Sequence, residues 1–455
     1  MSEPALSHAA AERLESAYRV LAGDDTDERA CEAIPAGACT DVPRNYLLNL
    51  ANGAATKLAE QLASPGLVLP WLLAGIGAPA TVTGLLVPLK QAGSLLPQLV
   101  VAGRIRSLAR RKWVWVAAGL FQALMLTVIG AGAMILPPEM AGPLTLLAFA
   151  IFSVASGAGS VAFQDVMGKT IPAGRRGRLL SHRALVGGGL TLIAAGVFRV
   201  LSADAVDVQL TVALLLIAAL LWALGAAAFA AMEEQDGATS GGRSMLHEVA
   251  AGLKLVREVP GYRGFLWARG LLLGVELAAP FFALHASGLY GNGAAQLGSY
   301  VFALGLANVV ASPLWGRWSD ATAHRVMAVA GLIAVAAGLL ALALTWVPAA
   351  IGIWAYAGVF LLVGVAEAGL RLGRKTYLLD GAPADERPLY VAFANTAMGL
   401  LALAGVALGV LADVTVPATA IGAVIVLAAL GALASWRLPP ARDMTMEVLG
   451  HSDVG

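Results

Sequence analysis

A lysine and a glutamate lie inside a stretch of the chain that otherwise has the composition of a membrane-spanning helix. The stretch reads NYLLNLANGAATKLAEQLAS over residues 45–64, and its charged residues are Lys57 and Glu60. A charge at the centre of a lipid-facing helix costs at least about 2.5 kcal/mol, so both side chains are expected to face protein or water. A carboxylate that alternates between wet and dry surroundings can take up and release a proton, whereas an ammonium group can bind an anion.

Further polar side chains recur on the same face of this predicted helix. They lie three and four residues apart, with Lys57 and Gln61 beside them, and they are Asn49, Asn52, Thr56 and Glu60. Residues at this spacing share one face of an α-helix, so the pattern predicts a helix with one wet side. The alternative is that Lys57 and Glu60 form a structural ion pair buried between helices.

The composition of the whole chain indicates an integral membrane protein built from helices. Of its 455 residues 58% are hydrophobic and 13% are charged, and the mean hydropathy is +0.76. Soluble domains contain about 25% charged residues. The 52 glycines favour closely packed helices, because a barrel would show short alternating strands. A net charge of +1 gives no field that would attract nucleic acid.

Apolar runs near the roughly 20 residues that cross a bilayer follow one another along the chain. Twelve such runs are predicted, at 46–73, 80–102, 113–136, 142–164, 182–201, 208–231, 263–287, 294–315, 326–347, 350–373, 388–411 and 415–436. The connections after even-numbered runs carry Lys and Arg, whereas those after odd-numbered runs carry acids such as Glu139. The positive-inside rule therefore predicts a plasma-membrane protein with both termini in the cytoplasm, and no cleavable signal is expected.

The chain divides into two halves of equal size and parallel orientation. We expect a cytoplasmic tail at 1–44, a six-helix half at 45–232, a cytoplasmic linker at 233–262, a second six-helix half at 263–437 and a tail at 438–455. The first tail contains Cys31 and Cys39, which are expected to be reduced thiols. Duplication of this kind is typical of transporters whose site lies at mid-membrane between the halves.

Two loop segments resemble the G-x-x-x-D-x-x-G-R-K/R signature of the major facilitator superfamily, whose members are twelve-helix secondary transporters. The segment GRWSDATAHR at 316–325 keeps the first glycine, Asp320 and the final Arg325, and GRIRSLARRK at 103–112 keeps the glycine and the basic end. The resemblance implies an all-α membrane fold of two pseudo-symmetric six-helix halves and transport by alternating access. Asp320 and Arg325 would then latch one access state.

The resemblance also implies that the first, fourth, seventh and tenth helices line a central cavity. Lys57, Lys90 and Glu276 fall at similar depth by helix geometry, and Glu60 lies one turn from Lys57. Glu60 and Glu276 are the candidates for proton coupling, and Lys57 and Lys90 would attract an anionic substrate. The alternative is that Lys57–Glu60 and Lys90–Glu276 are structural pairs.

Other polar and aromatic residues near the predicted helix ends are expected to have structural roles. Asp165 with Lys169, and Glu367 with Arg371, have the four-residue spacing of gate or latch pairs. Arg269 is expected to snorkel. Five tryptophans near the predicted interfaces are expected to be anchors, namely Trp71, Trp113, Trp115, Trp346 and Trp354.

These residues together predict a secondary active transporter that is coupled to protons and carries a small organic solute, with an anionic one favoured by the lysines. No phosphate-cradling loop, metal cluster, cofactor motif or enzyme signature is found in the sequence. The expected partners are the solute, protons and membrane lipids, and the expected state is a monomer. The alternatives are a transport-fold factor for assembly or sensing of membrane proteins or pigments, and a lipid flippase.

Overall fold

The computed structural model consists of helices throughout the residues it describes, which are 8–22, 40–106, 108–172, 175–201, 208–236, 245–291, 294–383 and 387–445. Cys31 and Cys39 lie outside these ranges. The helices are α1 (His8–Ala22), α2 (Val42–Leu62), α3 (Val68–Gly75), α4 (Ala80–Arg106), α5 (Lys112–Ile135), α6 (Pro138–Thr170), α7 (Arg176–Leu201), α8 (Val208–Ala230), α9 (Met245–Glu258), α10 (Pro260–Glu276), α11 (Ala279–Tyr290), α12 (Ala294–Ala343), α13 (Ala349–Gly381), α14 (Arg387–Ala402), α15 (Val406–Val414) and α16 (Pro417–Trp436). Short 3-10 turns cover Leu344–Trp346, Leu403–Gly405 and Ala441–Asp443.

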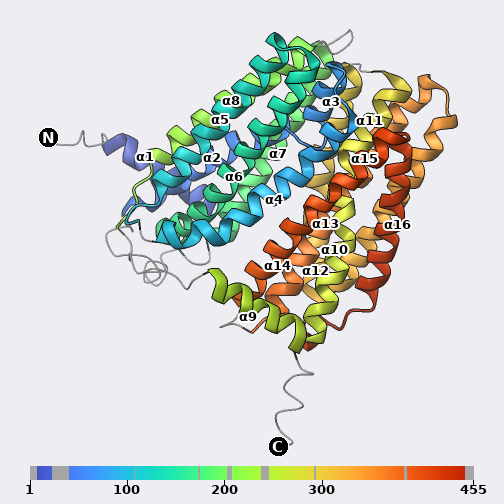
Figure 1. Cartoon of the computed structure of the whole chain (residues 1–455). Helices are drawn as coiled ribbons and strands as arrows, with labels where there is room; N and C mark the ends of the chain where they lie inside the picture. The colour runs from blue at the N-terminus through green and yellow to red at the C-terminus, as the bar shows by residue number, and fades with distance from the viewer. Residues whose placement is uncertain are drawn as a thin grey trace, which may run out of the picture.

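The helices pack as two groups that follow chain order. Helices α2 to α8 form the N-terminal bundle and α10 to α16 the C-terminal bundle; α4 and α7 lie at the boundary, where α4 packs on α14 and α15 and α7 packs on α12. We call the end with α3, α11 and α15 the distal end and the end with α1 and α9 the proximal end. In Figure 1 the bundles meet near α3, α11 and α15, whereas their proximal ends point in different directions.

Eight helical stretches are long and apolar enough to cross a membrane, within the part of the chain that the structure describes. The other four of the twelve predicted runs are helical as well, in α2 with α3, α4, α7 and the first part of α12. Three of these helices carry charged residues within the predicted run, including Lys57, Glu60, Lys90 and Arg183. The multi-pass helical membrane architecture is therefore confirmed, and the count of twelve crossings stays a prediction.

The first predicted run of each half is broken into two helices, which the sequence analysis did not anticipate. The run 46–73 is divided between α2 and α3 near Pro65, and the run 263–287 is divided between α10 and α11 near Pro280. A proline inside a helix removes one backbone hydrogen bond and its ring clashes with the preceding turn. The two breaks contact each other, because a Cβ added to Gly66 would lie 2.8 Å from the Cβ of Ala279.

The bundles close on each other at the distal end through apolar side chains. Leu67, Trp71 and Val87 belong to the same buried cluster as residues of α10 to α13, and the rings of Trp71 and Tyr300 lie 6.0 Å apart. Trp71 is 2% exposed and Trp115 is 7% exposed, so their prediction as interface anchors is wrong.

The distal contact also includes a polar link and a close backbone approach. The Asp413 carboxylate accepts a hydrogen bond from the backbone N–H of Thr81 at 2.6 Å, and it contacts the Thr81 hydroxyl. Asp413 of α15 therefore caps the first turn of α4 across the bundle interface. One turn further, a Cβ added to Gly84 would lie 2.8 Å from the Cα of Gly409, so only glycine allows this approach.

Candidate functional site

The site is built around Lys57 and Glu60, which lie near the C-terminal end of α2. Lys57 Nζ and Glu60 Oε2 are 2.7 Å apart, and the two side chains are 48% and 38% exposed. The backbone of α7 approaches closely at Gly187, where a Cβ would lie 2.4 Å from the Cβ of Lys57. Lys90 of α4 and Arg183 of α7 lie close enough to Glu60 for their charges to act on its carboxylate. The half-exposed pair therefore lies beside α4 and α7.

Arg183 is a site residue that the sequence analysis missed. The residue is 7% exposed, and its Nη1 donates to the backbone oxygen of Asn49 at 2.6 Å and to Oδ1 of Asn52 at 2.9 Å. It also contacts Oδ1 of Asn49. Its guanidinium lies 4.6 Å from the ring centroid of Phe163. An arginine inside a predicted apolar run was the available signal, because such a charge must find a partner.

The predicted polar stripe of α2 is divided between two environments. Asn52 donates from Nδ2 to the backbone oxygen of Gly225 at 2.9 Å, and Asn45 makes two 2.9 Å hydrogen bonds with the backbone of Glu233. These asparagines therefore join α2 to α8 and to the segment that follows it, whereas Lys57 and Glu60 keep open surroundings. Gln61 is half-buried at the end of α2.

Lys90 extends the positive charge of the site from α4. Its Nζ donates to Oγ of Ser156 at 3.0 Å and lies 4.8 Å from the ring centroid of Phe152. The pairing of Lys90 with Glu276, one of the alternatives in the sequence analysis, is absent from the described contacts of these two residues. The charge of Lys90 acts on Glu60 instead.

Glu276 links the two bundles at the break between α10 and α11. Its Oε2 accepts a 2.8 Å hydrogen bond from Nε2 of Gln91 on α4, and its Oε1 forms an ion pair with Arg374 on α13. The Glu276 side chain is 12% exposed. In the part of the chain that the structure describes, the bundles share two polar links, Gln91–Glu276 and Thr81–Asp413. Each described ion pair joins residues of a single bundle or of one helix.

The C-terminal bundle contains a second buried arginine. Arg269 is 6% exposed, and its Nη2 donates to Oδ1 of Asn395 on α14 at 2.9 Å. Its predicted snorkelling to the membrane interface is therefore wrong, because an amide partner inside the bundle is available. Glu367 and Arg371 lie one turn apart on α13, and their role as a gate stays a prediction.

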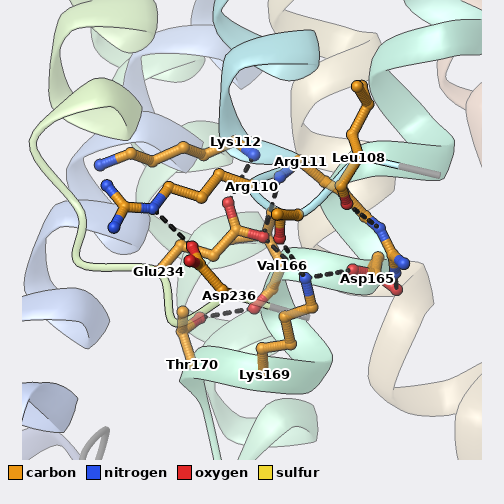
Figure 2. Close-up of polar contacts among 11 residues, drawn as sticks. Leu108, Arg110, Arg111, Lys112, Asp165, Val166, Lys169, Thr170, Glu234 and Asp236 are labelled. Atoms are coloured by element: carbon orange, nitrogen blue, oxygen red, sulfur yellow. Dashed lines mark hydrogen bonds and ion pairs between the residues drawn. The ribbon is translucent and has the colours of Figure 1, made fainter. Parts of the chain in front are cut away.

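A charged cluster joins three helix ends of the N-terminal bundle at its proximal end (Figure 2). The buried carboxylate of Glu234 accepts hydrogen bonds from the backbone N–H groups of Arg111 at 3.0 Å and Lys112 at 2.7 Å, and thereby caps the start of α5. Lys169 Nζ lies 3.0 Å from Glu234 and 3.2 Å from Asp165. Arg111 pairs with Asp165 as well.

This cluster bears on the predicted gate residues. The pair Asp165–Lys169 is formed, and it ties the end of α6 to α5 and to the segment after α8. Its members belong to one bundle, so the geometry favours a latch that holds helix ends together over a gate between bundles. Arg325 lies 5.9 Å from the ring centroid of Trp436, and the side chain of Asp320 is outside the described residues.

The architecture is that of two packed helical bundles, and known proteins relate it to a family. Residues 265–448 match the model of the Major Facilitator Superfamily. Among solved structures, the nucleoside transporter NupG has a TM-score of 0.63 and 14% identity, with 86% of this chain and 99% of that chain covered. A D-xylose-proton symporter has a TM-score of 0.59 and 15% identity, with 88% and 98% covered. The resemblance to the major facilitator superfamily is thereby confirmed.

Relatives in sequence extend over nearly the same length. The uncharacterized protein Rv2209 of Mycobacterium tuberculosis is 29% identical over 432 residues, which cover 89% of this chain and 79% of that protein. An uncharacterized protein of Mycobacterium bovis, Mb2232, matches with the same identity and coverage.

Proposed function

We propose that the protein is a secondary active transporter, driven by protons, that carries a small organic anion by alternating access. The observation that carries the proposal is the hydrogen bond between Gln91 and Glu276, which joins the two bundles at a helix break. A glutamate in this position exchanges partners when the bundles move relative to each other. Its affinity for a proton then depends on the access state, which is the requirement for coupling.

The helix breaks support a site between the bundles. The first helix of each bundle stops halfway, after Glu60 in one and after Glu276 in the other, and the two breaks contact each other at Gly66 and Ala279. Interrupted helices in corresponding positions of two halves are typical of transporter binding sites.

The charges of the site favour a proton and an anion as the transported species. Glu60 and Glu276 are the acids that would carry the proton, and Lys57 and Lys90 supply positive charge beside Glu60. The described residues of the site contain more basic than acidic groups, so an organic cation would be repelled.

The positive-inside rule orients this molecule in the plasma membrane with its termini in the cytoplasm. The distal end then faces outward, and the contacts of Trp71 with Tyr300 and of Thr81 with Asp413 close it. In this proposed orientation the molecule would be closed to the outside.

The proposal is tested with purified protein in liposomes that contain a pH-sensitive dye. Lactate, succinate, glutamate and glycerol 3-phosphate are added one at a time, with and without a proton gradient, to wild type and to Glu60→Gln. We expect at least one anion to move protons in the wild type, and we expect Glu60→Gln to lose this flux. Glu139→Gln, an exposed acid at the distal end, is the matched control and is expected to transport normally.

Two results would contradict the proposal. Proton-independent uptake that Glu60→Gln leaves intact would show that the acid is structural. No flux with any anion, together with a co-purifying membrane protein, would favour the assembly or sensing function instead.

A further inference from the structure

We propose that Arg183 is the residue that binds the anionic group of the substrate, and that the substrate is an organic dianion, either a dicarboxylate or a phosphate monoester. This inference rests on the proposed transport function and names the substrate class of the same site. It depends on the partners of Arg183, on the groups that hold it in place and on the balance of charge around Glu60.

The partners of Arg183 leave its charge without an acidic partner in direct contact. Its hydrogen bonds go to neutral oxygens of Asn49 and Asn52, and all of them start from Nη1. In the described part of the chain, no carboxylate lies within ion-pair distance of Arg183. The Nε and Nη2 donors are therefore available as the parallel pair that binds a carboxylate or a phosphate.

The guanidinium of Arg183 is held in position before any ligand binds. The ring of Phe163 supports it at 4.6 Å, and the acceptors on α2 fix one of its nitrogens. Space for it comes from Gly53, where a Cβ would lie 2.4 Å from the Cγ of Arg183. A side chain that is already ordered loses little rotamer freedom on binding, which favours affinity.

The charge balance of this part of the site favours two negative charges on the ligand. Lys57, Lys90 and Arg183 act on one carboxylate, Glu60, so three positive charges and one negative charge leave an excess of two. An uncompensated charge inside a membrane protein costs free energy. A dianion would neutralise the excess, whereas a monoanion would neutralise half of it and a neutral solute none.

In the C-terminal bundle an arginine charge is neutralised by a carboxylate of the protein itself. Arg374 pairs directly with the carboxylate of Glu276, which also accepts from Gln91. Arg183 has asparagine oxygens in the equivalent role, and these carry no net charge. Arg269 of the C-terminal bundle also has an asparagine partner, Asn395, but the three-to-one balance of basic and acidic groups is described around Arg183.

A binding experiment tests this inference without requiring transport. Thermal stability and calorimetric Kd are measured on the full-length protein in detergent with four probes, namely succinate, glycerol 3-phosphate, lactate and glycerol. The variants are Arg183→Gln and Arg183→Lys, and the control is Arg175→Gln, a buried arginine that contacts Tyr18 just before α7.

We expect a dianion to bind the wild type and Arg175→Gln with equal Kd, and to bind more tightly than lactate or glycerol. Loss of charge-assisted hydrogen bonds in Arg183→Gln should weaken binding by about 10-fold to 100-fold. Arg183→Lys keeps the charge without the paired donors, so its Kd should lie between the two. A preference for succinate or for glycerol 3-phosphate tells the dicarboxylate from the phosphate monoester.

The inference is overturned if neither dianion binds the wild type, or if a dianion binds both Arg183 variants as tightly as the wild type. Arg183→Lys keeps the test valid if Arg183→Gln does not fold. Dianion binding without proton-driven flux would contradict the proposed function and leave this inference standing. Proton-driven flux of lactate, a monoanion, that Arg183→Lys leaves unchanged would overturn this inference and leave the proposed function standing.

Discussion

The first helices of the two bundles break in the same way, but the glutamates beside the two breaks have different partners and different exposure. Glu60 pairs with Lys57 on the same helix, one turn away, and both side chains are about half-exposed. Glu276 is 12% exposed, and its partners Gln91 and Arg374 come from two other helices, one of which belongs to the opposite bundle.

This difference separates two tasks that one proton-coupled transporter must perform. A pair within one helix keeps its geometry when the bundles move, so Lys57–Glu60 can meet solute and proton in either access state. One partner of Glu276, Gln91, lies on the opposite bundle, so in the proposed alternating access this contact would depend on the access state. We infer that the N-terminal bundle holds the binding chemistry and that Glu276 couples it to movement.

Removing the partner of the more buried glutamate should have the largest effect on stability. Arg374→Gln leaves the part-buried Glu276 without its ion-pair partner; breaking a fully buried pair costs about 3 to 5 kcal/mol, which is the upper limit for this pair. A large drop in the unfolding temperature of the detergent-solubilised protein is expected. The double variant with Glu276→Gln should recover part of the loss, and an undiminished effect in the double variant would show that the two side chains do not interact.

Cutting the link between bundles should shift the access equilibrium. Gln91→Leu removes a hydrogen bond to a charged group, which is worth about 1.5 to 3 kcal/mol. Spin labels at the exposed distal residues Met140 and Val414, with Cys31 and Cys39 replaced by serine, measure the opening. We expect a larger population with separated labels, and identical distance distributions in wild type and variant would contradict the coupling role of Glu276.

Loss of the distal cap should have a similar but smaller effect. Asp413→Ala removes the acceptor for the N–H of Thr81 at the start of α4, and loss of a helix cap costs about 1 kcal/mol. The same spin labels should show partial distal opening. Asp413→Asn is the control, because asparagine caps helices as well as aspartate does, and equal opening in both variants would assign the effect to charge instead of capping.

The smallest stability change is expected for the exposed pair. Lys57→Gln removes an ion pair between half-exposed side chains on one helix, which is worth about 1 kcal/mol or less. Anion transport should nevertheless be lost in the liposome assay. Substantial unfolding with transport retained in the folded fraction would support the structural alternative for Lys57 and Glu60.

The sequence predicts the architecture well because hydropathy alone decides it. Every predicted apolar run coincides with helix, and the charges of Lys57 and Glu60 indicate the site because lipid cannot hold them. The helix breaks carried a signal in Pro65 and Pro280 that a hydropathy window averages away.

The pairings could not be predicted because they depend on distances between helices. Counting residues along each helix placed Lys90 and Glu276 at the same depth in the membrane. Depth does not show which helix faces contact each other, and each of the two residues contacts other partners. Arg183 was missed because it lies at the start of the predicted run 182–201, where an arginine is expected at the membrane surface. Only the packed structure shows that oxygens of Asn49 and Asn52 accept hydrogen bonds from Arg183.

The close approach of Gly84 and Gly409 has a consequence for the speed of the cycle. Where these two backbones meet without side chains, forming the contact freezes no rotamers, whereas burying long side chains would cost up to about 1.5 to 2 kcal/mol each in lost entropy. This part of the interface can therefore form and separate many times without side chains having to reorder, which suits a surface that must part once in every turnover.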